Sequence, residues 1–116
     1  MYEVSRERFE ELVAEALDTV PRPLMSVMNN VVVMVEDWPP TQDPHLLGRY
    51  EGIPLTERTT GYSAVLPDRI TIYRLPILGI CRDDAEVVRE VHVTVVHEIA
   101  HHFGIDDGRL HELGYG

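Results

Sequence analysis

The sequence predicts a single small α+β domain. Two segments carry apolar residues at helical spacing, over residues 5–20 and from Asp83 to about Phe103, and short apolar runs of strand character lie between them. A chain of 116 residues is long enough for one hydrophobic core and too short for two. We therefore expect one domain over residues 1–116, in which a mixed sheet of three or four strands packs against an N-terminal helix and a central helix. A short C-terminal helix completes the expected fold.

The first helix is predicted over residues 5–20. Ser5 suits the N-cap position, because its hydroxyl can accept a hydrogen bond from a free amide of the first turn. Pro21 and Pro23 are expected to end the helix. Its apolar residues recur at three- and four-residue steps: Phe9, Leu12, Val13, Ala16, Leu17 and Val20.

Three strands are predicted between the helices. Residues 30–35 are mainly β-branched, with four valines and no polar alternation, which indicates a strand buried on both faces. Residues 36–44 contain three prolines and are expected to form a loop. Residues 46–53 include two glycines, typical of an edge strand with a bulge. After a loop over residues 54–68, the alternating segment 69–74 predicts another strand.

The second long helix is predicted to begin at a capping box formed by Asp83 and Glu86. It is apolar over much of its circumference, so we expect it to be central and buried. Many of its residues are β-branched and therefore poor helix formers, which means that packing and caps must hold it. A last short helix is predicted over residues 107–113.

The candidate metal-binding and catalytic residues lie at the end of this second helix, where residues 97–107 read H-E-x-x-H-x-x-G-x-x-D. His97 and His101 are four residues apart and share one helix face, so both can bind one zinc ion. Glu98 is rotated to the side, where a general base can take a proton from water. Gly104 can end the helix with a positive φ, which would let the chain turn back and offer Asp107 as a third ligand.

The identity of the third ligand stays open on spacing alone. Asp106, His111 and Glu112 are rivals of Asp107, which could instead cap the final helix. His102 lies about 140° around the helix from His97, so we interpret it, with His92, as a surface or supporting residue. No partner for His45 is identifiable in the sequence.

Composition excludes several other classes. A formal net charge of −10 disfavours binding to nucleic acid. The chain has no apolar run near 18 residues, so no membrane helix is expected, and the charged N-terminus does not resemble a secretory signal. Cys81 is the only cysteine and is interpreted as a small buried apolar residue. A cytoplasmic location is the simplest expectation.

The motif of residues 97–107 resembles that of the zincin metallopeptidases, in the form that has aspartate as its third ligand. Residues 47–58 and 66–73 are similar to segments of a family of minimal bacterial zincin-like domains, and the similarity extends from about residue 44 onward. The resemblance implies zinc held by His97, His101 and Asp107, with Glu98 as the catalytic acid and base. It also implies a zincin sheet whose edge strand, over residues 46–53, pairs with an extended peptide.

One feature departs from the metzincin pattern, in which a methionine turn follows the motif. All four methionines precede it here. Tyr115 or Leu113 would have to form the floor of the site, and Tyr115 is also a candidate partner for the oxyanion. With so little chain after Asp107, we expect a shallow cleft with few subsites.

We therefore expect a soluble, zinc-dependent peptidase that acts on short or unfolded peptide segments. The alternative is a catalytically inactive zincin-fold module that recognises a peptide or protein partner. Glu98 favours the enzyme, because a purely structural metal site needs no base beside the ion. An open sheet edge in so small a domain also favours a homodimer.

Overall fold

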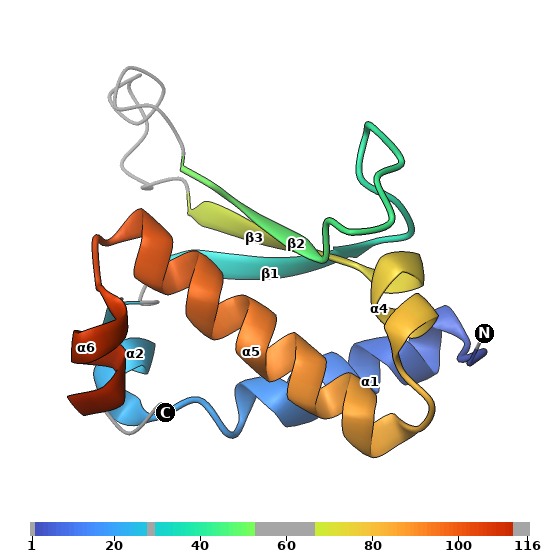
Figure 1. Cartoon of the computed structure of the whole chain (residues 1–116), viewed down its shortest axis with the longest axis horizontal. Coiled ribbons are helices and arrows are strands. Elements are labelled where there is room, and N and C mark those ends of the chain that lie inside the picture. Colours follow the sequence, from blue (N-terminus) through green and yellow to red (C-terminus); the bar gives the residue numbers. More distant parts are fainter. Residues whose placement is uncertain (1, 28–29, 53–66, 113–116) are drawn as a thin grey trace.

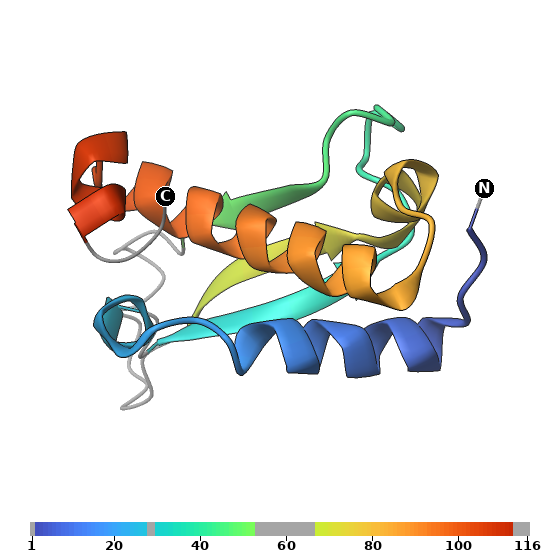
Figure 2. The same cartoon turned by 60° about the horizontal axis from the view of Figure 1, so that its bottom comes forward.

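The computed structural model describes residues 2–27, 30–52 and 67–112, without the side chains of Val27, Asp107, Leu110 and His111. Figure 1 and Figure 2 show two long helices, α1 and α5, side by side on one face of a small sheet, which confirms the predicted α+β class. The described elements follow in the order α1 (Arg6–Leu17), α2 (Arg22–Val27), β1 (Val31–Glu36), β2 (Gly48–Glu51), β3 (Asp68–Tyr73), α4 (Arg74–Ile80), α5 (Asp84–His102) and α6 (Asp107–Glu112).

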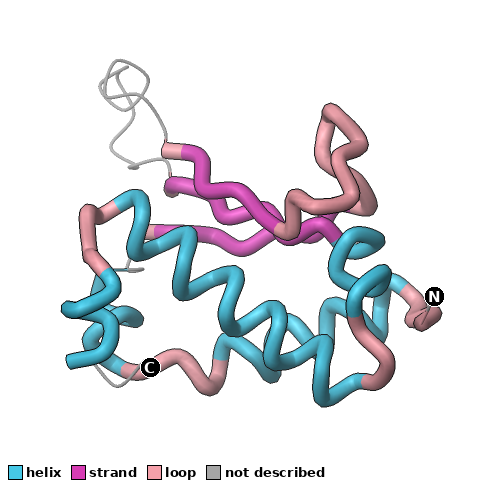
Figure 3. The backbone as a smooth tube through the Cα atoms, viewed as in Figure 1, coloured by secondary structure: helices cyan, strands magenta, loops and turns pink. Residues whose placement is uncertain are grey.

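The described sheet has three strands in the order β1-β3-β2 (Figure 3). β1 pairs in parallel with β3, and β2 pairs antiparallel with β3, so the sheet is mixed as predicted. The last strand in sequence is therefore the central one, and β2 lies at an edge. The register of β2 against β3 is continuous from Gly48 to Glu51, without the bulge expected from the glycines.

The core lies between the inner face of the sheet and the two long helices. Helix α1 contributes side chains at its predicted apolar positions, and α5 contributes the largest share. The residues that are completely inaccessible include Phe9, Leu12, Ala16, Ile70, Ile72, Ile77, Val87, Val91, Val95 and Ile99. Burial of this apolar surface holds α5 in place despite its β-branched composition.

The prediction that residues 30–35 form a strand buried on both faces is wrong. Burial alternates along β1: Val35 is buried, whereas Val32 and Met34 keep 40% and 41% of their surface accessible. Both long helices pack on the inner face of the sheet (Figure 1), and the outer-face side chains of β1, Val32 and Met34, are left accessible. An uninterrupted β-branched run therefore does not distinguish a two-sided strand from a one-sided edge strand.

Two short helices, α2 and α4, are not among the predicted elements; Pro23, in α2, was expected only to end the preceding helix. Pro23 and Pro76 lie within the first turns of these helices, where the missing amide breaks no intrahelical hydrogen bond. Helix α1 ends at Leu17 rather than residue 20, and Thr19 and Val20 follow in a turn. The strand predicted over residues 69–74 is shifted by one residue, because Arg74 begins α4.

Asp83 caps the start of α5, as predicted, but the second hydrogen bond of the predicted capping box differs. The Asp83 side chain accepts a hydrogen bond from the Glu86 amide at 2.9 Å. The return contact differs from an ideal capping box, because the Glu86 carboxylate accepts from the amide of Arg82 at 2.6 Å, one residue before the cap. Hydrogen bonds from Arg82 lower the pKa of Glu86, which favours the charged form beside the helix N-terminus.

Cys81, between α4 and α5, is buried as predicted. Only 4% of its surface is accessible, and burial raises the pKa of its thiol to about 11. At neutral pH this cysteine is therefore a neutral apolar side chain and a poor nucleophile.

Candidate metal centre

Helix α5 carries His97, Glu98 and His101 in its last two turns, as the sequence predicted. Both histidines are exposed, while Glu98 is half-buried. Their spacing places the two imidazoles on one face of the helix, about one turn apart. The pair therefore faces solvent rather than the packed core.

A left-handed residue ends this helix, again as predicted. Gly104 has a φ of 68°. The Ile105 amide donates to the carbonyl of Ala100 at 2.8 Å, and the Gly104 amide donates to the carbonyl of His101 at 3.4 Å. These two bonds form a Schellman motif, which satisfies the last carbonyls of the helix and reverses the chain.

After this reversal, Asp106 rather than Asp107 caps α6. The Asp106 carboxylate accepts from the Arg109 amide at 2.8 Å, and Asp107 is the first residue of the helix. Glu112, another rival third ligand, pairs with Arg109 at 2.9 Å. The Asp107 and His111 side chains lie outside the described part of the structure, as do all atoms of Leu113 and Tyr115.

Glu98 reaches the edge of the sheet. Its Oε1 accepts a hydrogen bond from the main-chain amide of Tyr50, in β2, at 2.9 Å. The carbonyl of Leu47 faces β3, where it accepts from the amide of Tyr73. Because main-chain groups alternate along an antiparallel strand, those of Gly48 and Tyr50 face away from β3, toward the edge that no other described strand covers. The carboxylate of Glu98 is therefore held at that edge.

Helix α5 follows β2 closely on either side of this contact. A Cβ atom added to Gly48 would lie 2.6 Å from Thr94 Cγ2, and one added to Gly52 would lie 3.3 Å from His102 Cε1. The three contacts are four residues apart on the helix and two residues apart on the strand. Four helical residues advance about 6.0 Å and two strand residues about 6.7 Å, so the spacing of the contacts matches on the two elements. The two glycines, from which an edge strand with a bulge was expected, instead leave room for α5 to lie this close to β2.

Replacing Gly48 with alanine is expected to destabilise the fold by about 1–3 kcal/mol, because the new methyl group overlaps Thr94. It would also lie 3.1 Å from the main-chain oxygen of Thr71, which cannot easily move. Urea unfolding measures the change, and Gly52→Ala, with its looser neighbour, should cost less. Adding Thr94→Ala should recover part of the loss, and a Gly48→Ala protein as stable as wild type would contradict this packing.

The donor set at the end of α5 fits zinc. Imidazole nitrogens and carboxylate oxygens are both zinc ligands, and the hydrogen bond from Tyr50 gives Glu98 a separate partner beside the histidine pair. No cluster of three metal-binding side chains is found among the described side chains, a set that does not include Asp107. The structure thus describes two candidate ligands and the candidate base.

The other histidines lie in different surroundings. His102 stacks on the ring of Tyr50, with centroids 3.8 Å apart, and its Nε2 lies 3.9 Å from the Asp68 carboxylate. This cluster was not predicted from the sequence, in which the two glycines on one face of β2 are the only signal of a close approach. His92 Nδ1 lies 2.7 Å from the hydroxyl of Thr19, near the end of α1. His45 is exposed, and its amide donates to the Asp43 carboxylate.

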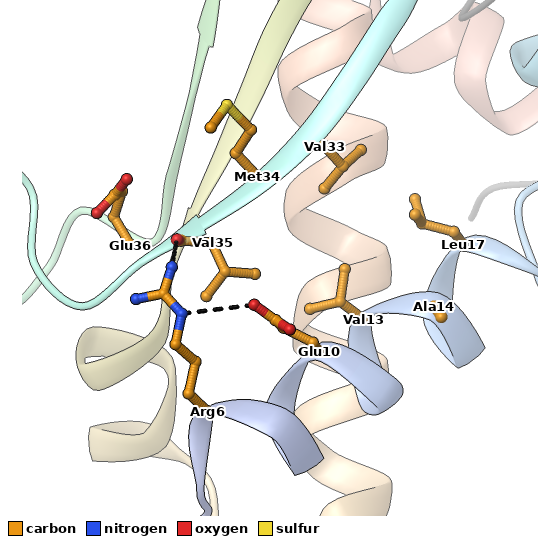
Figure 4. A pocket seen from close by; sticks show the side chains of 9 residues that line it. All are labelled: Arg6, Glu10, Val13, Ala14, Leu17, Val33, Met34, Val35 and Glu36. Atoms are coloured by element: carbon orange, nitrogen blue, oxygen red, sulfur yellow. Dashed lines mark hydrogen bonds and ion pairs between the residues drawn. The ribbon is translucent and has the colours of Figure 1, made fainter.

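A groove of about 460 Å³ lies between α1 and β1, and none of the motif residues lines it (Figure 4). Its walls are mainly apolar, with Val13, Leu17 and Val33 among them. At one end, the Arg6 guanidinium donates to the main-chain oxygen of Val35 and pairs with Glu10 at 3.4 Å. The groove is thus separate from the candidate metal centre.

Comparisons with known proteins agree with the fold and with the family that the sequence resembles. Residues 28–116, most of the chain, match the family of zincin-like metallopeptidases. The chain therefore belongs to this family, and the predicted zincin-like fold is confirmed. A solved structure of a conserved hypothetical protein from Thermus thermophilus is similar, with 26% sequence identity and a TM-score of 0.56. The match covers 90% of this chain and 99% of that one.

A search of curated proteins found no match. Among the described residues, no helix is long and apolar enough to span a membrane.

Proposed function

We propose that this protein is a zinc-dependent peptidase that cleaves peptide bonds in short or unfolded segments. In this proposal His97, His101 and Asp107 bind the metal, and Glu98 is the general base. The position of Glu98 carries the proposal: its carboxylate is held by the Tyr50 amide at the β2 edge of the described sheet, on the same helix end as two exposed histidines. Membership of the zincin-like metallopeptidase family supports the same reaction class.

The residues of the chain have separate roles in the proposed hydrolysis. When bound, zinc would polarise the peptide carbonyl and make the attacking water more acidic. Glu98 takes a proton from this water and then gives it to the leaving amine. The Tyr50 amide binds Oε1 of Glu98, which orients the carboxylate for this transfer.

The edge of β2 favours an extended substrate. No other described strand pairs with β2 on the side that the Tyr50 amide faces, so we place a strand-like substrate along this edge, beside Tyr50 rather than at the buried Gly48. Folded proteins rarely present an accessible extended segment, which is why we propose short or unfolded peptides as substrates.

The proposal is tested by digesting a peptide library with the purified full chain and identifying products by mass spectrometry. Cleavage is expected with zinc present, should stop when 1,10-phenanthroline removes the metal, and should return when zinc is restored. If the zinc-loaded protein cleaves none of the peptides but binds some of them, the non-catalytic module is the correct interpretation.

A further inference from the structure

We propose that His102 is a positioning residue for Glu98 and acts through Tyr50. By stacking on the Tyr50 ring, it holds β2 against the end of α5, so that the Tyr50 amide meets the Glu98 carboxylate. The catalytic part of this inference rests on the proposed function. The structural part concerns one main-chain hydrogen bond and can be tested without any cleavage.

The stack is close and nearly parallel. The ring centroids of Tyr50 and His102 are 3.8 Å apart, and the two planes differ by 19°. Phe103 packs edge-on against both rings, at 6.0 Å from Tyr50 and 4.9 Å from His102. Three mutual contacts of this kind restrict the Tyr50 ring more than one pair would.

The far end of the same ring is also held. The Tyr50 hydroxyl donates to Asp68 Oδ2 at 2.7 Å, and His102 Nε2 lies 3.9 Å from that oxygen. The Asp68 side chain is only 13% exposed. Tyr50 is therefore fixed by its hydroxyl to the central strand β3 and by its face to helix α5.

This restraint matters because Tyr50 lies in an edge strand. Its amide faces away from β3, so none of the described strands holds it on that side. Gly52, two residues further on, leaves room for the His102 ring, which approaches to within 3.3 Å of the position a Cβ atom would take. One end of helix α5 thus carries the proposed base, two proposed ligands and the residue that positions the base.

The experiment compares His102→Leu with His102→Phe in the full chain. Leucine keeps an apolar side chain of similar size but cannot stack as a flat ring. Phenylalanine keeps the flat ring but has no nitrogen to face Asp68. In the metal-free protein, hydrogen exchange of the Tyr50 amide, followed by NMR, should be faster in His102→Leu and near wild type in His102→Phe.

The same variants are then assayed on a peptide cleaved in the library. His102→Leu should lower kcat by roughly tenfold or more, because small displacements of a catalytic group have large effects. KM and the zinc content should change little, and His102→Phe should recover most of kcat. Equal Tyr50 exchange in wild type and His102→Leu, or no recovery in His102→Phe, would overturn the inference. If the wild type cleaves nothing, the proposed function fails, while the exchange data still decide whether His102 positions Tyr50.

Discussion

Replacing Glu98 with glutamine is expected to lower kcat for peptide cleavage by about 10²–10⁴-fold, the usual contribution of a general base. Glutamine has nearly the same shape and can still accept the hydrogen bond from the Tyr50 amide, so the edge contact should survive. The zinc content should stay at one ion per chain, because Glu98 is not a proposed ligand. Steady-state kinetics and metal analysis of the same preparation measure both quantities.

The matched control is Glu90→Gln, which removes one carboxylate about two turns earlier on the same helix. This variant should cleave at the wild-type rate, since Glu90 lies away from the histidine pair. Equal rates in wild type and Glu98→Gln would mean that another group is the base or that a contaminant cleaves the peptide.

Zinc binding is expected to raise the thermal stability of the protein. Zinc at a thousandfold excess over its Kd stabilises a folded protein by about 4 kcal/mol, which in a domain of this size raises Tm by roughly 10–20 °C. We expect this rise in the wild type and its loss in His101→Ala, because two ligands cannot hold the ion tightly. Thermal unfolding with and without zinc measures the difference.

The control for this prediction is His45→Ala. His45 is an exposed histidine in the loop before β2, and its removal should leave the zinc-dependent shift unchanged. A His101→Ala protein that zinc stabilises as strongly as wild type would show that the ion binds elsewhere.

The sequence predicted the two long helices well because their signals are local. The apolar spacing of α1 and the Asp83 cap of α5 depend on residues within a few positions of each other. The short helices α2 and α4 were not predicted, because each has only six or seven residues and a proline in its first turn, which leaves too few positions for a helical apolar pattern. The exposed face of β1 depends on which elements cover the sheet, and no local pattern specifies that.

In the candidate site, too, some features follow from local sequence and others depend on the packed structure. The placement of His97, Glu98 and His101 at the end of α5 follows from helical spacing and one glycine. The hydrogen bond between Tyr50 and Glu98 joins residues 48 positions apart, and it depends on the antiparallel register of β2. The stack of His102 on Tyr50 likewise requires the packed structure, because the spacing predicts only that His102 points away from the ligand face.

Anomalous X-ray scattering at the zinc absorption edge, from crystals of the zinc-loaded full chain, would show whether His97, His101 and Asp107 share one zinc ion. We expect one strong peak about 2.0–2.2 Å from a ring nitrogen of His97, a ring nitrogen of His101 and a carboxylate oxygen of Asp107. This expectation would be contradicted by crystals with bound zinc at another site, or by no peak between the two histidines despite saturating zinc.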